Sequence, residues 1–257
     1  MTAPAVHVFE HRLVSYRRTF RGSLFSSFLQ PALFLTAMGV GLGALVNRPG
    51  NAALGGVSYL VFLAPGLLAG TAMQTAAFES TFPVMAAIRW VRSYVAMLAT
   101  PIGVNDIVIG QLAWIAVRLT MVATIFVAIM TLFGATHSPA ILLAIPVAVL
   151  TGMAFSAPIA AFSATQENAE GFNMLFRFVI NPLFLFSGTF FPVGQLPALL
   201  QPIAYVTPLY HGVALARQLS LGTGTVSEAI LHGGVLVAFV VVGVVACLIT
   251  FRQRLVK

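Results

Sequence analysis

The chain has 257 residues, of which 59% are hydrophobic and only 7% are charged. A soluble domain typically carries about 25% charged residues, so this composition excludes a soluble globular protein and indicates a chain that lies mostly within a bilayer. The formal net charge is +7. Because the arginines lie at the ends of apolar stretches, we attribute this charge to the cytoplasmic excess of cations in membrane proteins rather than to nucleic-acid binding.

Residues 1–22 are basic and amphipathic. Apolar residues recur there at spacings of three and four, which places them on one helical face. The other side carries the arginines Arg12, Arg17, Arg18 and Arg21. We therefore predict an interfacial helix on the cytoplasmic surface. A cleaved signal peptide is the alternative, but both the basic lead and the apolar stretch after it are longer than such a signal needs.

Six apolar stretches are long enough to cross a bilayer, which takes about 20 helical residues. The expected fold is an all-α integral membrane protein with a single transmembrane domain. The first two stretches contain G-x-x-x-G pairs, Gly39 with Gly43 and Gly66 with Gly70, which allow helices to approach closely. The six predicted spans are residues 24–46, 59–77, 107–133, 141–162, 174–191 and 230–251.

Residues 79–105, between the second and third predicted spans, have the pattern of an amphipathic helix. Apolar residues recur at helical spacing and two arginines lie on another face. The apolar residues are Ile88, Val91, Val95 and Leu98, and the arginines are Arg89 and Arg92. We predict a cytoplasmic helix along this region. A plain loop helix at the interface is the alternative.

Arg118 is the one charged residue inside the third predicted span. An arginine near the bilayer centre costs roughly 2.5 to 3.5 kcal/mol on insertion scales, so it usually faces the bundle interior and pairs with an acid. Glu167 and Glu170, in the short turn before the fifth span, are the candidate partners. A structural ion pair and a role in a transport path are both open for Arg118. The two glutamates could also act as paired carboxylates, but a solvated cytoplasmic turn is the better interpretation of 163–173.

The stretch after the fifth span is apolar but contains many helix breakers. Internal prolines remove helix hydrogen bonds, and broken helix survives in a membrane only where protein or water covers it. We predict a broken re-entrant hairpin over 192–219 that shapes a pathway. An outer loop lying on lipid is the alternative. Candidate residues for the pathway or its outer gate are Phe186, Phe190, Phe191 and His211. The phenylalanines suit ordinary packing equally well, and a structural role at the membrane edge is the better interpretation of His211.

Six spans with both termini in the cytoplasm place most cations inside, as the positive-inside rule requires. The only lysine is Lys257, so the chain lacks a G-x-x-x-x-G-K-[ST] phosphate-binding loop. The single cysteine, Cys247, excludes a disulfide framework or a cysteine-based metal site within one chain, and we predict neither a catalytic nor a metal site. Any energy for uphill transport is therefore expected from another polypeptide.

Three segments carry a resemblance to a known family. They are LFSGTFFPVGQLPALLQPIAYVTPLYHGVALAR at 185–217, AMLATPIGVNDIVIGQLAW at 96–114 and the opening at 10–43. The chain resembles the membrane subunit of ABC-2 type exporters over nearly its whole length. Within that family it looks closest to permeases of nodulation lipo-oligosaccharide exporters, and daunorubicin-type drug exporters are more distant.

The resemblance implies a separate ATPase subunit that binds ATP and Mg, a second permease subunit forming a homodimer or heterodimer, and a location in the plasma membrane. It also implies that the helix within 79–105 is the coupling helix that contacts the ATPase, through Glu79, Arg89 and Arg92, and that the hairpin caps the pathway outside. The expected function is ATP-driven export of an amphipathic cargo: a lipo-oligosaccharide, a glycolipid or a hydrophobic drug. A gradient-driven carrier and a non-transporting membrane scaffold are the alternatives.

Overall fold

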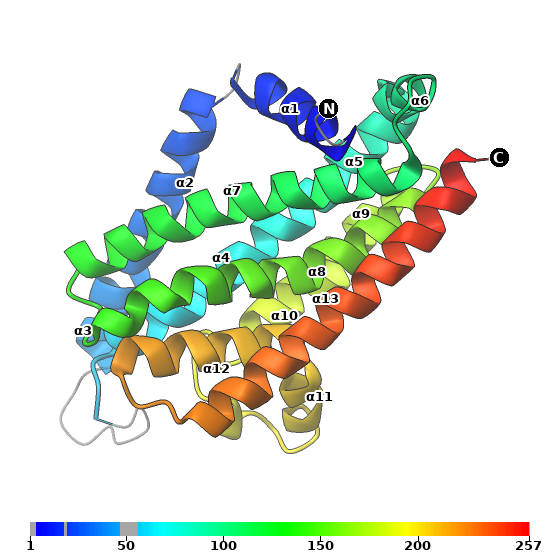
Figure 1. Ribbon diagram of the computed structural model, residues 1–257. Coiled ribbons are helices and arrows are strands. Elements are labelled where there is room, and N and C mark those ends of the chain that lie inside the picture. Colours follow the sequence, from blue (N-terminus) through cyan, green and yellow to red (C-terminus); the bar gives the residue numbers. More distant parts are fainter. Residues whose placement is uncertain (1–3, 18–19, 47–55, 257) are drawn as a thin grey trace.

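The computed structural model describes residues 4–17, 20–46 and 56–256 (Figure 1). Every regular element within these ranges is a helix, which confirms the predicted all-α fold. The segment 48–51, where Pro49 and Gly50 predict a helix break, lies outside the described residues, as do Arg18 and the side chain of Arg21.

Five helical segments are long and apolar enough to cross a membrane. They are Ser27–Val46, Tyr59–Trp90, Val104–Leu132, Pro139–Thr165 and Val226–Leu255. The remaining predicted span, at 174–191, corresponds to the consecutive helices α9 (Glu170–Leu175), η5 (Phe176–Ile180) and α10 (Asn181–Phe186). This shorter run ends before Ser187 and Gly188, where the chain turns with a positive φ of 82° at the glycine. The count of six spans stays a prediction.

Helix α4 (Tyr59–Ser80) is the centre of the bundle. It packs against α7 (Val104–Leu132), α8 (Ala144–Thr165) and α12 (Pro208–Leu221). Small residues make this possible, as expected for helices that associate within lipid. At Gly70, for example, an added Cβ would lie 2.4 Å from the Phe184 ring, so α10 approaches α4 closely only because this position has no side chain.

The basic N-terminal segment forms α1 (Pro4–Arg17), which packs across the first half of α7. Val8 is fully buried there, and the rings of Phe9 and Tyr16 both contact Trp114. One face of α1 therefore packs against the protein, in addition to any contact that the helix makes with a membrane surface. After α1 the chain continues through α2 (Phe20–Phe34), the π-helix η1 (Leu35–Leu42) and α3 (Gly43–Val46).

The region expected to form one amphipathic helix over 79–105 consists of three short helices instead. They are α5 (Phe82–Met85), the π-helix η3 (Ala86–Trp90) and α6 (Ser93–Leu98). The break before α6 lies at Arg92, which has a left-handed backbone with φ 56°. A non-glycine residue in this conformation is uncommon. The arginine thus forms a sharp turn between η3 and α6.

The proline-rich segment after α10 folds as η6 (Val193–Gln195), α11 (Gln201–Val206) and α12, before α13 (Val226–Leu255). Pro202 and Pro208 lie in the first turns of α11 and α12, where a missing N–H costs no hydrogen bond. These prolines therefore begin helices rather than kink them. Figure 1 shows α11 and α12 below the bundle and α1 and α6 above it, so the two groups occupy opposite ends.

Candidate functional site

The most polar interior region lies between α1, α4, α6 and α7. We call it the polar cluster, and it consists of Arg12, Tyr16, Glu79, Tyr94, Gln111 and Arg118. These residues come from chain positions up to 106 residues apart, and only three-dimensional packing brings them together.

Arg118 lies at the middle of α7 and forms an ion pair with Glu79, from the last turn of α4. Arg118 Nε donates to Glu79 Oε1 at 3.2 Å, and the two side chains are only 9% and 17% exposed. Its Nη1 also donates to the Tyr16 hydroxyl at 2.6 Å. The partner of Arg118 is therefore Glu79 and not Glu167 or Glu170 as expected, because α4 packs along α7 and ends level with the arginine.

A second part of the polar cluster is built around Tyr94, which is 1% exposed. Arg12 Nη2 donates to the Tyr94 hydroxyl at 2.8 Å, and that hydroxyl donates to Gln111 Oε1 at 3.0 Å. Burial raises the pKa of Tyr94, and this outweighs the opposite effect of Arg12. The phenol therefore keeps the proton that it donates to Gln111. Gln111 Nε2 donates a weak hydrogen bond to the Glu79 carbonyl at 3.5 Å, and this bond connects the two parts of the polar cluster.

The predicted ATPase-contacting residues occupy different environments. Glu79 is in the interior, as described. Arg89 lies nearer the surface, where Nη2 donates to Glu167 Oε1 at 3.2 Å. Because Glu167 is 80% exposed, such a pair contributes only about 0 to 1 kcal/mol. Arg92 is exposed at the left-handed turn.

An exposed apolar pair stands between the two arginines. Trp90 is 61% exposed and Val91 is 74% exposed. We call residues Arg89, Trp90, Val91 and Arg92 the tip. Tyr94, which belongs to the polar cluster, follows the tip by two residues. The tip thus presents apolar and cationic groups at the surface and is joined directly to the buried polar cluster.

Glu167 and Glu170 have separate roles. Glu167 pairs with Arg89, whereas Glu170 is the exposed first residue of α9, where its backbone N–H donates to Asn168 Oδ1 at 3.1 Å. An acid in the first turn of a helix is favoured by the helix dipole. The two carboxylates therefore have different neighbours and different local functions.

The four residues predicted to line an outer pathway make different contacts, and their role stays a prediction. Phe186 is 43% exposed. Phe190 stacks edge-on against Phe184 at a centroid distance of 5.2 Å, and Phe191 packs in a small cluster with Val193 and Leu196. His211 Nδ1 lies 2.7 Å from His232 Nδ1, which joins α12 to α13.

The sequence analysis assigned no role to Arg217. In the structure its side chain is largely enclosed between α12, α4 and the turn at Gly188. The sequence signal was its position as the first charge after a long uncharged stretch that starts at Arg177.

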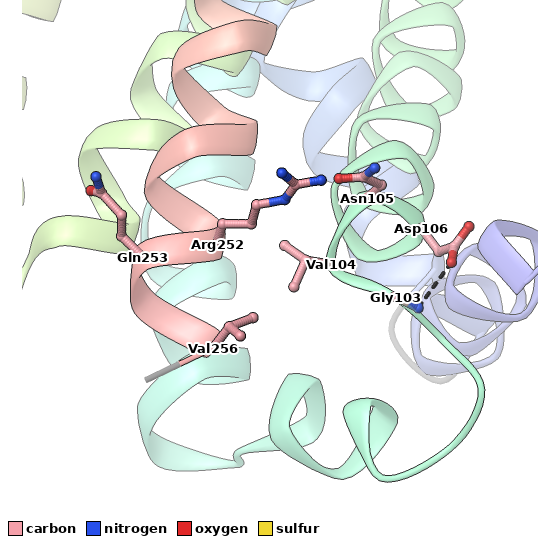
Figure 2. A pocket seen from close by; sticks show the side chains of 7 residues that line it. All are labelled: Gly103, Val104, Asn105, Asp106, Arg252, Gln253 and Val256. Carbon is pink, nitrogen blue, oxygen red and sulfur yellow. Dashed lines mark hydrogen bonds between the residues drawn. The ribbon is translucent and has the colours of Figure 1, made fainter.

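A cavity of about 680 Å³ opens between the start of α7 and the end of α13 (Figure 2). In Figure 2 the Arg252 side chain points across it toward Asn105. The Asp106 carboxylate accepts a hydrogen bond from the Gly103 N–H at 2.9 Å and so caps α7. The cavity lies at the same end of the bundle as Tyr94, whose ring contacts Phe251.

These features define a multi-pass membrane protein with a buried polar cluster between α1, α4, α6 and α7. Comparison with known sequences agrees: the chain matches the ABC-2 type transporter family over residues 8–221. The protein therefore belongs to the ABC-2 type transporter family, as expected from the resemblance. Members of this family are membrane subunits that associate with a separate ABC ATPase.

Individual relatives span nearly the same length. The chain is 33% identical to Nodulation protein J of Rhizobium leguminosarum bv. viciae, over 97% of this chain and 94% of that protein. It is 32% identical to Nodulation protein J of Rhizobium meliloti (strain 1021), over 97% of this chain and 93% of that protein. It is 23% identical to Inner membrane transport permease YadH of Escherichia coli (strain K12), over 86% of this chain and 85% of that protein.

Proposed function

We propose that this protein is the permease subunit of an ATP-driven exporter, that a second permease subunit completes the pathway, and that the cargo is amphipathic: a lipo-oligosaccharide, a glycolipid or a hydrophobic drug. The ATPase subunit, which binds ATP and Mg, docks on the tip. The observation that supports this most strongly is the direct connection between the exposed tip and the polar cluster inside the same end of the bundle.

The distribution of cations supports a cytoplasmic location for the tip. The helix α1, the segment from α5 to α6 and the end of α13 lie at one end, and they carry Arg12, Arg17, Arg89, Arg92, Arg252 and Arg254, whereas α12, which carries Arg217, lies toward the opposite end (Figure 1). By the positive-inside rule, the α1–α6 end and both termini face the cytoplasm of the cell that carries this protein in its plasma membrane. The α11–α12 end then faces outward.

The mechanism follows from the hydrogen bonds of the polar cluster. When the ATPase dimer closes on ATP, the tip moves with it. Tyr94 passes this movement to Arg12 on α1 and to Gln111 on α7, while Glu79 ties the end of α4 to Arg118. ATP can drive the change only if the ATPase binds the two conformations of the permease with different affinity. A rigid, satisfied hydrogen-bond cluster favours movement of α1, α4 and α7 as one unit.

The test is the double charge reversal Arg89→Glu with Arg92→Glu in the tip. We expect loss of ATPase co-purification and of ATP-dependent transport in vesicles, because the docking surface becomes acidic. The matched control is Arg252→Glu with Arg254→Glu, at the same end but outside the tip, which is expected to keep both activities. Unchanged co-purification and transport in the tip variant would overturn the docking assignment.

A further inference from the structure

Arg217 is a largely enclosed cation, and among the described residues no carboxylate lies beside it. Its Nε donates to the Phe62 carbonyl at 3.2 Å and its Nη2 to the Gly188 carbonyl at 2.9 Å. Its guanidinium carbon lies 3.8 Å from the centroid of the Phe62 ring. These contacts orient the guanidinium but supply no negative charge, and no described carboxylate forms an ion pair with it. An enclosed charge without a counter-charge is costly, so an anion bound here would be stabilised.

The arginine lines a pocket of about 300 Å³ at the α11–α12 end. We call this the Arg217 pocket. Its polar lining, all from described residues, consists of hydroxyl and amide groups and includes no carboxylate: Ser187, Tyr205, Tyr210, Gln218 and Thr223. Hydroxyl and guanidinium donors without a competing acid are the chemistry that oxyanions require.

One polar atom of this lining lacks a partner. Gln218 Oε1 is buried and makes no hydrogen bond within the described part of the chain. Because an amide can exchange its oxygen and nitrogen positions by rotation, Gln218 can also offer its NH₂ group to a ligand. An unsatisfied buried amide oxygen next to a guanidinium without a counter-charge indicates that the pocket is completed by a bound molecule.

Size limits what that molecule can be. The volume lies at the lower end of small-molecule sites, which span about 300 to 1,000 Å³. It accommodates a phosphate-sized group with a few attached atoms, whereas a whole lipid would have to remain outside.

We propose that the Arg217 pocket binds a phosphate group or a similar oxyanion, carried either by a phospholipid headgroup or by a phosphorylated solute. Arg217 supplies the charge, and the Thr223 hydroxyl and the Gln218 amide supply further donors. The location on the outer side of the membrane rests on the orientation given under the proposed function, but the binding itself does not.

The experiment measures binding to the purified full-length protein in a phosphate-free maltoside detergent, without ATP or ATPase. The first arm titrates sodium phosphate against sodium chloride of equal ionic strength. The second compares dioctanoyl phosphatidylglycerol with dioctanoylglycerol, which has the same chains and no phosphate. The readouts are the shift in thermal unfolding midpoint and the number of bound molecules by native mass spectrometry.

Gln218→Glu places a carboxylate of the same shape in the pocket, where it supplies the missing counter-charge. We expect the affinity for the phosphate probe to fall about tenfold or more. Thr223→Val, on an exposed turn, is a second variant and is expected to weaken binding several-fold. Gln195→Glu makes the same charge change at an exposed position outside the lining of the pocket, and it should bind like the wild type.

A stabilising effect of phosphate alone would identify a solute as the source, and an effect of the phospholipid alone would identify a headgroup. The proposal is overturned if neither probe stabilises the wild type, or if Gln218→Glu binds as tightly as Gln195→Glu. Because no ATPase is present, failure here would leave the permease assignment intact, and loss of ATPase docking would leave this proposal intact.

Discussion

The two enclosed arginines, Arg118 and Arg217, have different kinds of hydrogen-bond and charge partners. Arg118 has a carboxylate, Glu79, and a phenol, Tyr16. Arg217 has two backbone carbonyls and the ring of Phe62. The Arg118 arrangement neutralises the charge and joins helices, whereas the Arg217 arrangement leaves a net positive charge beside a pocket. We therefore interpret Arg118 as a structural cation and Arg217 as a ligand-binding one.

Removing either partner of the Arg118–Glu79 pair should be strongly destabilising. The pair is largely buried, so Glu79→Gln or Arg118→Gln alone is expected to lower the free energy of unfolding by about 3 kcal/mol, since each leaves an uncompensated charge. The double variant should cost less than the sum of the two. Denaturant unfolding of the purified single and double variants measures this difference, and strictly additive effects would contradict the ion pair.

Residue chemistry alone could predict that Arg118 needs an acid, but it could not identify which one. Glu167 and Glu170 were expected because their predicted turn lies on the same side of the membrane. Glu79 is the partner of Arg118 because α4 ends level with the middle of α7, and this follows from the packing between the two helices. Arg217 escaped notice for a related reason: its enclosure depends on the turn at Gly188, which sequence periodicity does not describe.

At the scale of elements, helix breakers decide where the chain departs from plain spans. The prolines of 192–219 correctly predicted interrupted helix there, and the structure shows that Pro202 and Pro208 begin α11 and α12. The region 79–105 was expected as one helix because its apolar spacing is regular. It is divided at Arg92, whose left-handed backbone a spacing pattern does not describe.

Close helix contact at Gly70 leads to a prediction for α4. In Gly70→Ala the new Cβ would lie 2.4 Å from the Phe184 ring. Overpacking of this kind typically costs about 1 to 3 kcal/mol, so the thermal unfolding midpoint should fall. The matched control is Gly41→Ala, where the nearest atom would be the Thr36 carbonyl oxygen at 3.7 Å. There the helix propensity of alanine should leave stability equal or slightly higher, and equal losses in both variants would argue against this packing.

At the scale of the whole molecule, the protein has two chemically different ends. One end carries the tip, the polar cluster and the cavity between α7 and α13. The other carries α11, α12 and the Arg217 pocket (Figure 1). Composition and the positions of the charges between apolar stretches predicted a helical membrane protein and its cation asymmetry, because both depend on many residues. The arrangement that joins the tip to the polar cluster depends on a few long-range contacts, and it became evident only in three dimensions.

The central claim is that the ATPase docks on the tip, and a cross-linking experiment tests it most directly. The only native cysteine, Cys247, is buried, so a single introduced thiol can be targeted. Val91→Cys places this thiol in the tip, and Leu199→Cys places it at an 87% exposed position at the opposite end. With a short amine-to-thiol cross-linker in native membranes, we expect the ATPase to be captured by Val91→Cys and not by Leu199→Cys. Capture at Leu199, or none at Val91 while the complex still co-purifies, would contradict the account.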